Sequence, residues 1–141
     1  MSHLKLQKIL YYVQALHLAY FDTPIIEDDF QAWLHGPVSR KVYDQIKGHS
    51  VLYTEVTYIY NEGEEYPNVI LKELITKDQL ELVNEIIDGY GKLTASQLEN
   101  LTHSEKPWLD ARVGYGVADR CEVVITKEAM RDFYKKEIYG E

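Results

Sequence analysis

Two short stretches of this sequence combine side chains that could do chemistry or bind a partner. In residues 30–38 an aromatic residue, an imidazole and a Gly-Pro turn come directly before a predicted helix. Residues 101–108 read Leu-Thr-His-Ser-Glu-Lys-Pro-Trp. Because Trp, Tyr and Arg dominate the energetics of protein interfaces, both stretches are candidate partner-binding sites. The candidate residues are Trp33, His35, Pro37, Arg40, Tyr43, His103 and Trp108.

Each stretch also has a purely structural interpretation. In the first, Trp33 would fill the core at a helix-turn-helix corner, and His35 would bond to backbone carbonyls. The functional interpretation makes the same corner a docking pocket, with Arg40 and Tyr43 at its rim. In the second stretch, Trp108 would wedge between helices. The residue types alone leave both interpretations open.

Catalytic and metal-binding patterns are missing from the sequence. The five histidines show no short ligand spacing such as H-x-x-x-H. There is no G-x-S-x-G motif and no glycine-rich phosphate loop, and the single cysteine, Cys121, lies in no recognisable active-site pattern. We therefore expect no catalytic residues, no metal, no cofactor and no enzymatic activity.

Composition and charge narrow the class of partner. The 141 residues are the size of one ordinary domain, so we expect a single domain over residues 1–141. The formal net charge of −8 disfavours binding to nucleic acid, which carries dense negative charge. No stretch approaches the roughly 20 apolar residues that span a bilayer, and a lone cysteine fits a reducing compartment. These features predict a cytoplasmic protein without membrane contact.

The elements that must position the candidate residues follow from the hydrophobic pattern. Apolar residues at helical spacing predict a largely buried helix over 4–20. The pattern then predicts a short helix through residues 30–34, which Gly36 and Pro37 end, and another helix over 39–47.

The period of the pattern changes in the middle of the chain. Residues 54–60 and 68–71 are rich in β-branched and aromatic residues and predict a β-hairpin. Helical signals return with capping boxes at Thr76/Gln79 and Thr94/Gln97, then a short helix past Pro107 and a last helix that begins at Thr126. The predicted fold class is α+β, a predominantly helical single domain with a small antiparallel β-hairpin in the middle of the chain.

Three blocks of the sequence resemble the Panacea (SocA-type) family of antitoxins from bacteria and phages. Residues 5–19 resemble the family's opening helix, and residues 30–43 match its F-x-A-W-x-x-G-P-V-x-x-x-V-Y corner. Residues 98–112, with Leu-Thr-His followed by Pro-Trp, are similar to its C-terminal motif. The blocks occur in the family's order and cover about half of the chain, which makes the resemblance far more specific than any single tripeptide.

The resemblance implies an antitoxin that neutralises a cognate protein toxin by direct binding. In the SocA-type variant such an antitoxin also acts as an adaptor that hands the toxin to a host protease. An acidic, tyrosine-rich domain suits a basic toxin, since complementary charge speeds encounter. The alternatives are a DNA-binding transcriptional regulator with a winged-helix corner and a phage-encoded anti-defence binding protein. A homodimer is left open.

Overall fold

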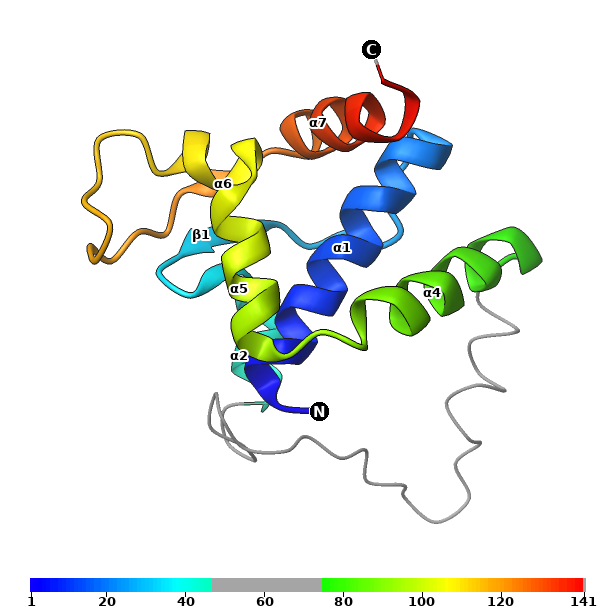
Figure 1. Ribbon diagram of the computed structural model, residues 1–141, viewed down its shortest axis with the longest axis horizontal. Helices are drawn as coiled ribbons and strands as arrows, with labels where there is room; N and C mark the ends of the chain where they lie inside the picture. Colours follow the sequence, from blue (N-terminus) through cyan, green and yellow to red (C-terminus); the bar gives the residue numbers. More distant parts are fainter. Residues whose placement is uncertain (47–74, 141) are drawn as a thin grey trace.

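The computed structural model describes residues 1–46 and 75–140, and this part of the chain contains six helices and three strands. Helix α1 runs through the middle, α4, α5 and α7 pack around it, and the small sheet lies to one side of it (Figure 1). The predicted fold class, predominantly helical α+β, is confirmed. The elements are α1 His3–Phe21, β1 Phe30–Trp33, β2 Gly36–Ser39, α2 Arg40–Ile46, α4 Lys77–Tyr90, α5 Ala95–Ser104, α6 Lys106–Ala111, β3 Val124–Ile125 and α7 Lys127–Tyr139.

Helix α1 is buried around most of its circumference, as its pattern predicts. It begins after Ser2, whose hydroxyl accepts a hydrogen bond from the backbone N–H of Lys5 at 3.2 Å. Its end is fixed by Asp22, which has a φ of 60° and donates its backbone N–H to the carbonyl of Leu18. Several polar residues are buried with the apolar ones, so the centre of the fold contains hydrogen-bonding side chains: Gln7, Lys8, Gln14 and His17.

The segment after α1 is a β-hairpin, and the short helix predicted over residues 30–34 is wrong. Strands β1 and β2 pair antiparallel from Phe30 opposite Ser39 to Trp33 opposite Gly36, so a two-residue turn joins them. Phe30 and Ala32 are buried while Gln31 and Trp33 are half-buried, which is the period of a strand. The helix prediction failed because the apolar residues at positions 30, 32, 33 and 34 match neither the helical period nor the strand period cleanly.

A third strand completes the sheet in the order β2-β1-β3. Strand β3 places Ile125 opposite Phe30, and the N–H of Ala32 donates to the carbonyl of Val123 at 2.8 Å. This two-residue strand was not predicted. The hairpin predicted over 54–60 and 68–71 lies outside the described residues.

The remaining helices confirm the predictions based on local caps. Thr76 and Gln79 form a reciprocal capping box before α4, and Thr94 and Gln97 form one before α5. Helix α7 begins after Thr126, whose hydroxyl accepts the N–H of Ala129 at 3.1 Å. The helix predicted over 39–47 corresponds to α2, although none of its residues is fully buried. No helix in the described ranges is long and apolar enough to cross a membrane.

A half-buried carboxylate, that of Glu105, joins α1, α7 and the α5–α6 junction. Tyr12 and Tyr134 donate their hydroxyls to Oε1 of Glu105 at 2.5 and 2.9 Å, and the hydroxyl of Tyr134 also lies 3.2 Å from that of Tyr11. Tyr90 of α4 stacks on Tyr12 with ring centroids 4.3 Å apart. Burial raises the pKa of Glu105, and the phenol donors only partly oppose that rise. Tyr11, Tyr12 and Tyr134 therefore belong to the core.

Candidate protein-binding groove

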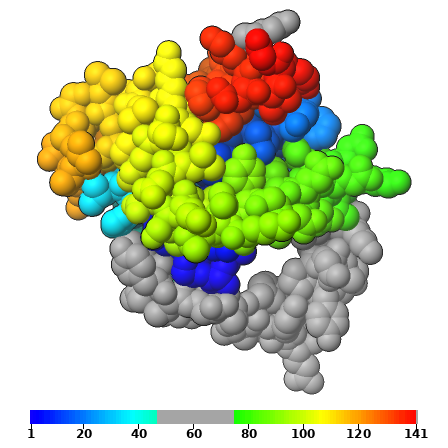
Figure 2. Space-filling model, in the orientation of Figure 1, coloured from blue at the N-terminus to red at the C-terminus, as the bar shows by residue number. Residues whose placement is uncertain are grey.

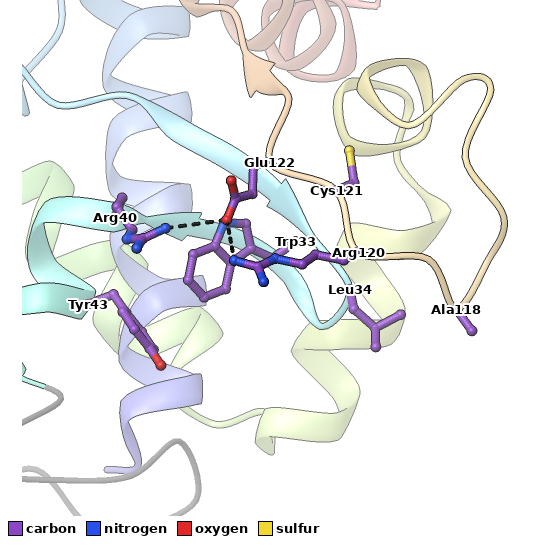
Figure 3. Close-up of a pocket in the computed structure, with 8 residues that line it drawn as sticks. All are labelled: Trp33, Leu34, Arg40, Tyr43, Ala118, Arg120, Cys121 and Glu122. Carbon is purple, nitrogen blue, oxygen red and sulfur yellow. Dashed lines mark hydrogen bonds and ion pairs between the residues drawn. The ribbon is translucent and has the colours of Figure 1, made fainter.

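A groove of about 530 Å³ opens beside the hairpin, between the end of β1, helix α2 and the segment 118–122 that leads into β3 (Figure 3). We call it the corner groove. Two segments far apart in the sequence form its walls, and the sheet pairing of β1 with β3 brings them together. Its lining residues are Trp33, Leu34, Arg40, Tyr43, Ala118, Arg120, Cys121 and Glu122.

Aromatic rings form one side of the corner groove. Trp33 and Tyr43 meet edge to face with ring centroids 4.9 Å apart, and the guanidinium carbon of Arg40 lies 5.7 Å from the Trp33 ring centroid. The indole N–H of Trp33 donates to Oε1 of Gln31 at 2.7 Å, and Tyr43 stacks on His3 from the other side. These contacts hold both rings in one orientation before any partner binds.

Charged side chains border these rings. Arg120 donates to Oε1 of Glu122 at 2.8 Å, and Arg40 reaches the same oxygen at 3.3 Å (Figure 3). Arg40 also lies 3.3 Å from Asp44 in the next turn of α2. Hydrogen bonding from Arg120 and its positive charge lower the pKa of Glu122. The groove thus combines an aromatic surface with guanidinium groups, which suits non-covalent recognition of another protein.

The structure brings the two candidate stretches together but gives their members different positions. Trp33, Arg40 and Tyr43 line the corner groove, whereas Pro37 is buried in β2 opposite Ala32. His35 lies in the hairpin turn with its Nδ1 2.6 Å from Oε1 of Glu99. The expectation that Trp33 fills the core is therefore wrong, because this ring is half-buried and faces the groove.

Trp108 and His103 support the hairpin from beneath. Trp108 is only 5% exposed, and its indole N–H donates to the carbonyl of Trp33 at 2.8 Å. His103 stacks on Trp108 with ring centroids 3.9 Å apart. The wedge interpretation of Trp108 describes its position, since the ring fills the space between α5, α6 and β1.

Arg112 ties the second wall of the groove to the first. Its guanidinium is buried and donates to the carbonyl of Ala32 at 2.8 Å and to those of Gly116 and Asp119 at 3.0 and 2.5 Å. The same group lies 5.0 Å from the Trp108 ring centroid. One side chain therefore links β1 to the segment 112–122. Sequence reasoning missed this role, because a single arginine after a short helix gives no local signal.

A buried lysine lies on the inner side of the hairpin turn. Lys8 of α1 is fully buried, and its Nζ has no hydrogen-bond partner in the described part of the chain. Burial lowers the pKa of Lys8 to about 7, and the negative charge of Glu99 offsets only part of that effect. Burial and the charge of Lys8 also lower the pKa of His3 and of His103. The sequence contained a signal for this cluster of Lys8, His3 and His103, because a lysine occurs on an otherwise apolar face of the predicted helix.

Gly36 makes this arrangement sterically feasible. It has a φ of +112°, and a Cβ at this position would lie 2.5 Å from Cε of Lys8 and 2.9 Å from Oγ1 of Thr102. Nearby, Gln7 holds the end of the hairpin, because its amide accepts the N–H of Ser39 at 2.9 Å and donates to the carbonyl of Ser39 at 3.3 Å. The side chains of α1 thus fix the turn on which the groove is built.

Within residues 1–46 and 75–140, no group of three or more His, Cys, Asp or Glu side chains is arranged to hold a metal ion.

Comparison with known proteins gives two matches. Residues 6–109 match the model of a family described as "Antitoxin SocA-like, Panacea domain". Antitoxin SocA of Caulobacter vibrioides is 29% identical over 108 residues, which cover 76% of this chain and 57% of that protein. The chain therefore spans little more than half the length of this curated relative. No solved structure matches it.

Proposed function

The chain belongs to the Antitoxin SocA-like family of Panacea domains, and we propose on this basis that it is an antitoxin that neutralises a cognate protein toxin by direct binding. The proposal places it in the cytoplasm, as a binding protein rather than an enzyme. Transfer of the bound toxin to a protease is a further step that the SocA-like relationship suggests. A phage origin would change only whose toxin is bound.

The corner groove is the surface that we propose for toxin binding, and its preorganised aromatic side carries the proposal. Trp33, Tyr43 and Arg40 are residue types that dominate interface energetics, and here they lie together on one accessible surface. Because the rings already have internal partners, little conformational entropy is lost when a toxin side chain enters the groove. The groove also lies within the residues that match the family, apart from its 118–122 wall.

The regulator alternative has less support. The basic residues of α2 are Arg40 and Lys41, and each lies within 4 Å of a carboxylate of the chain itself, at Asp44 and Glu122 or at Asp28. Phosphate binding would have to break these ion pairs in a protein with a net charge of −8. Specific binding of the upstream promoter in a gel shift at moderate salt would revive this alternative.

Co-expression with the product of the neighbouring gene tests the antitoxin role. We expect the chain to restore growth and to co-purify with that protein. Arg120→Glu and Leu34→Asp change exposed residues of the groove and should each weaken the complex at least tenfold without lowering the melting temperature. Lys106→Glu, an equal charge reversal at an exposed position outside the groove lining, is the matched control.

The outcomes separate the two parts of the proposal. If the wild-type chain neither restored growth nor co-purified with a toxic neighbour, the antitoxin role would be wrong for this pair. If the wild-type complex formed and both groove variants bound as tightly as the Lys106→Glu control, direct binding would stand, but the corner groove would not be its site.

A further inference from the structure

A second groove, of about 320 Å³, lies between α1 and α4 and shares no lining residue with the corner groove. We call it the α4 groove. Helix α4 occupies one face of the molecule beside the C-terminal half of α1, as the space-filling view shows (Figure 2). The lining is predominantly apolar: Leu16, Tyr20, Leu82, Glu85, Ile86, Gly89, Tyr90 and Leu93.

Gly89 lines the α4 groove without a side chain. It lies in the last turn of α4 with helical backbone, and a Cβ added there would meet no atom within 4 Å. Glycine lowers helix stability relative to alanine because it loses more backbone entropy on folding. No steric reason within the described residues requires glycine at this position. Its effect is to leave the groove unfilled, which a side chain would prevent.

A stripe of four carboxylates borders the same groove. Asp78, Glu81, Glu85 and Asp88 recur at intervals of three or four residues, so they share one face of α4, and all four are exposed. None of them forms an ion pair with any residue that the structure describes. Several acids elsewhere on the surface do have such partners, as in the pairs Asp22–Lys135, Asp28–Lys41 and Asp29–Lys127, although Glu128 and Glu137 of α7 have none among the described residues.

We propose that the α4 groove binds a basic amphipathic helix of the toxin, a contact that rests on the antitoxin role proposed above. The apolar lining fits the apolar side of such a helix, and the carboxylate stripe fits lysine or arginine side chains that recur every three or four residues along it. Helix α4 has 14 residues and is about 21 Å long, enough to accompany about four turns of a partner helix. The toxin is then held on two chemically different surfaces.

Gly89→Leu in the full chain is the first test, with the product of the neighbouring gene as the probe. Leucine favours the helix and places its side chain in the groove, so we expect affinity to fall at least tenfold while the melting temperature stays equal or rises. Weaker binding by an equally stable variant cannot result from unfolding.

Charge neutralisation tests the stripe separately. The triple variant Glu81→Gln, Glu85→Gln, Asp88→Asn should lower affinity about tenfold and reduce the dependence of affinity on salt, whereas Gly89→Leu should leave the salt dependence unchanged. The matched control removes three exposed acids of α7 and has the same net charge, so it should stay within about twofold of wild type. Its changes are Glu128→Gln, Asp132→Asn and Glu137→Gln.

The results distinguish failure of this inference from failure of the antitoxin role. Wild-type binding and growth rescue with no loss in Gly89→Leu would overturn the α4 groove as a docking site and leave the antitoxin role intact. If the α4 triple variant and the α7 control lost affinity equally, net charge alone would explain the loss. That result would overturn the proposed contact with the carboxylate stripe. A wild-type chain that neither binds nor rescues would overturn both.

Discussion

Replacement of Lys8 by methionine should stabilise the protein and abolish part of its pH dependence. The side chain of Lys8 is fully buried, and burial lowers its pKa from the ordinary 10.5 to about 7. Between pH 7 and 10.5 the unfolded chain therefore carries a proton that the folded chain does not carry. In this interval the free energy of unfolding should rise by about 1.4 kcal/mol per pH unit, or about 5 kcal/mol over the whole interval.

The direction of the pH effect depends on whether the folded or the unfolded state binds the proton of Lys8 more tightly. Below about pH 7 both states are protonated, so the full penalty for burying the ammonium is present, and the penalty is relieved as pH rises. The tyrosines act in the opposite direction above about pH 10, because burial raises the pKa of Tyr11 and Tyr12 and favours the unfolded state, where they ionise more easily. The contribution of Lys8 to the pH dependence of stability can therefore be measured between pH 7 and about 9.5.

Urea unfolding at a series of pH values measures this prediction. At pH 7 Lys8→Met should remove a penalty of about 4 kcal/mol and lose about 1 kcal/mol to imperfect repacking, for a net gain of about 3 kcal/mol. The slope between pH 7 and 9.5 should fall accordingly, while Lys136→Met, at an exposed position of α7, should keep the wild-type slope. A flat wild-type profile, or a Lys8→Met variant less stable than wild type at pH 7, would refute the conclusion that this ammonium is buried without a partner.

Substitutions at three further positions test the packing of the fold. Gly36→Ala should cost more than about 3 kcal/mol in urea unfolding, because φ is +112° and the new Cβ would lie 2.5 Å from the carbon next to the lysine nitrogen; a cost below 1 kcal/mol would contradict this geometry. Glu105→Leu should cost about 2–4 kcal/mol because two buried phenols lose their acceptor, whereas Glu105→Gln keeps an acceptor oxygen and should cost about 1 kcal/mol; equal costs would show that the hydrogen bonds contribute little. Gly89→Ala should raise the free energy of unfolding by about 0.5–1 kcal/mol, and calorimetry showing destabilisation would mean that the space beside Gly89 is occupied.

The helix ends could be predicted because their signals are local. Thr76, Thr94 and Thr126 each cap a helix through a hydrogen bond to a backbone N–H three residues ahead, so a few adjacent residues contain the whole interaction. The strand β1 could not be predicted in this way, because its apolar residues match neither the helical nor the strand period cleanly and its second partner, β3, comes more than 80 residues later. Only the folded chain shows that residues 30–33 extend along another strand.

The roles of the two tryptophans show the same limit at the candidate site. Both carry an indole N–H that donates a hydrogen bond, yet Trp108 is buried and Trp33 borders the corner groove. Burial of an aromatic ring is decided by which elements pack over it, and here α6 and β1 enclose one ring only. The sequence could indicate that these residues matter, but not which one a partner would touch.

The corner groove owes its shape to side chains that lie beneath it. The carbonyls of Ala32 and Trp33, at the end of β1, accept hydrogen bonds from Arg112 and Trp108, while Gln7 of α1 holds the far end of β2. A buried donor that lost its acceptor would cost about 1–3 kcal/mol, so the hairpin cannot move without disturbing several bonds at once. The groove walls are therefore positioned before a partner arrives. The α4 groove is defined differently, by the lack of a side chain at Gly89 and by a stripe of carboxylates that form no ion pair with the residues that the structure describes. Substitutions that alter one groove should therefore leave the other intact, and this independence allows the two proposed contacts to be measured separately.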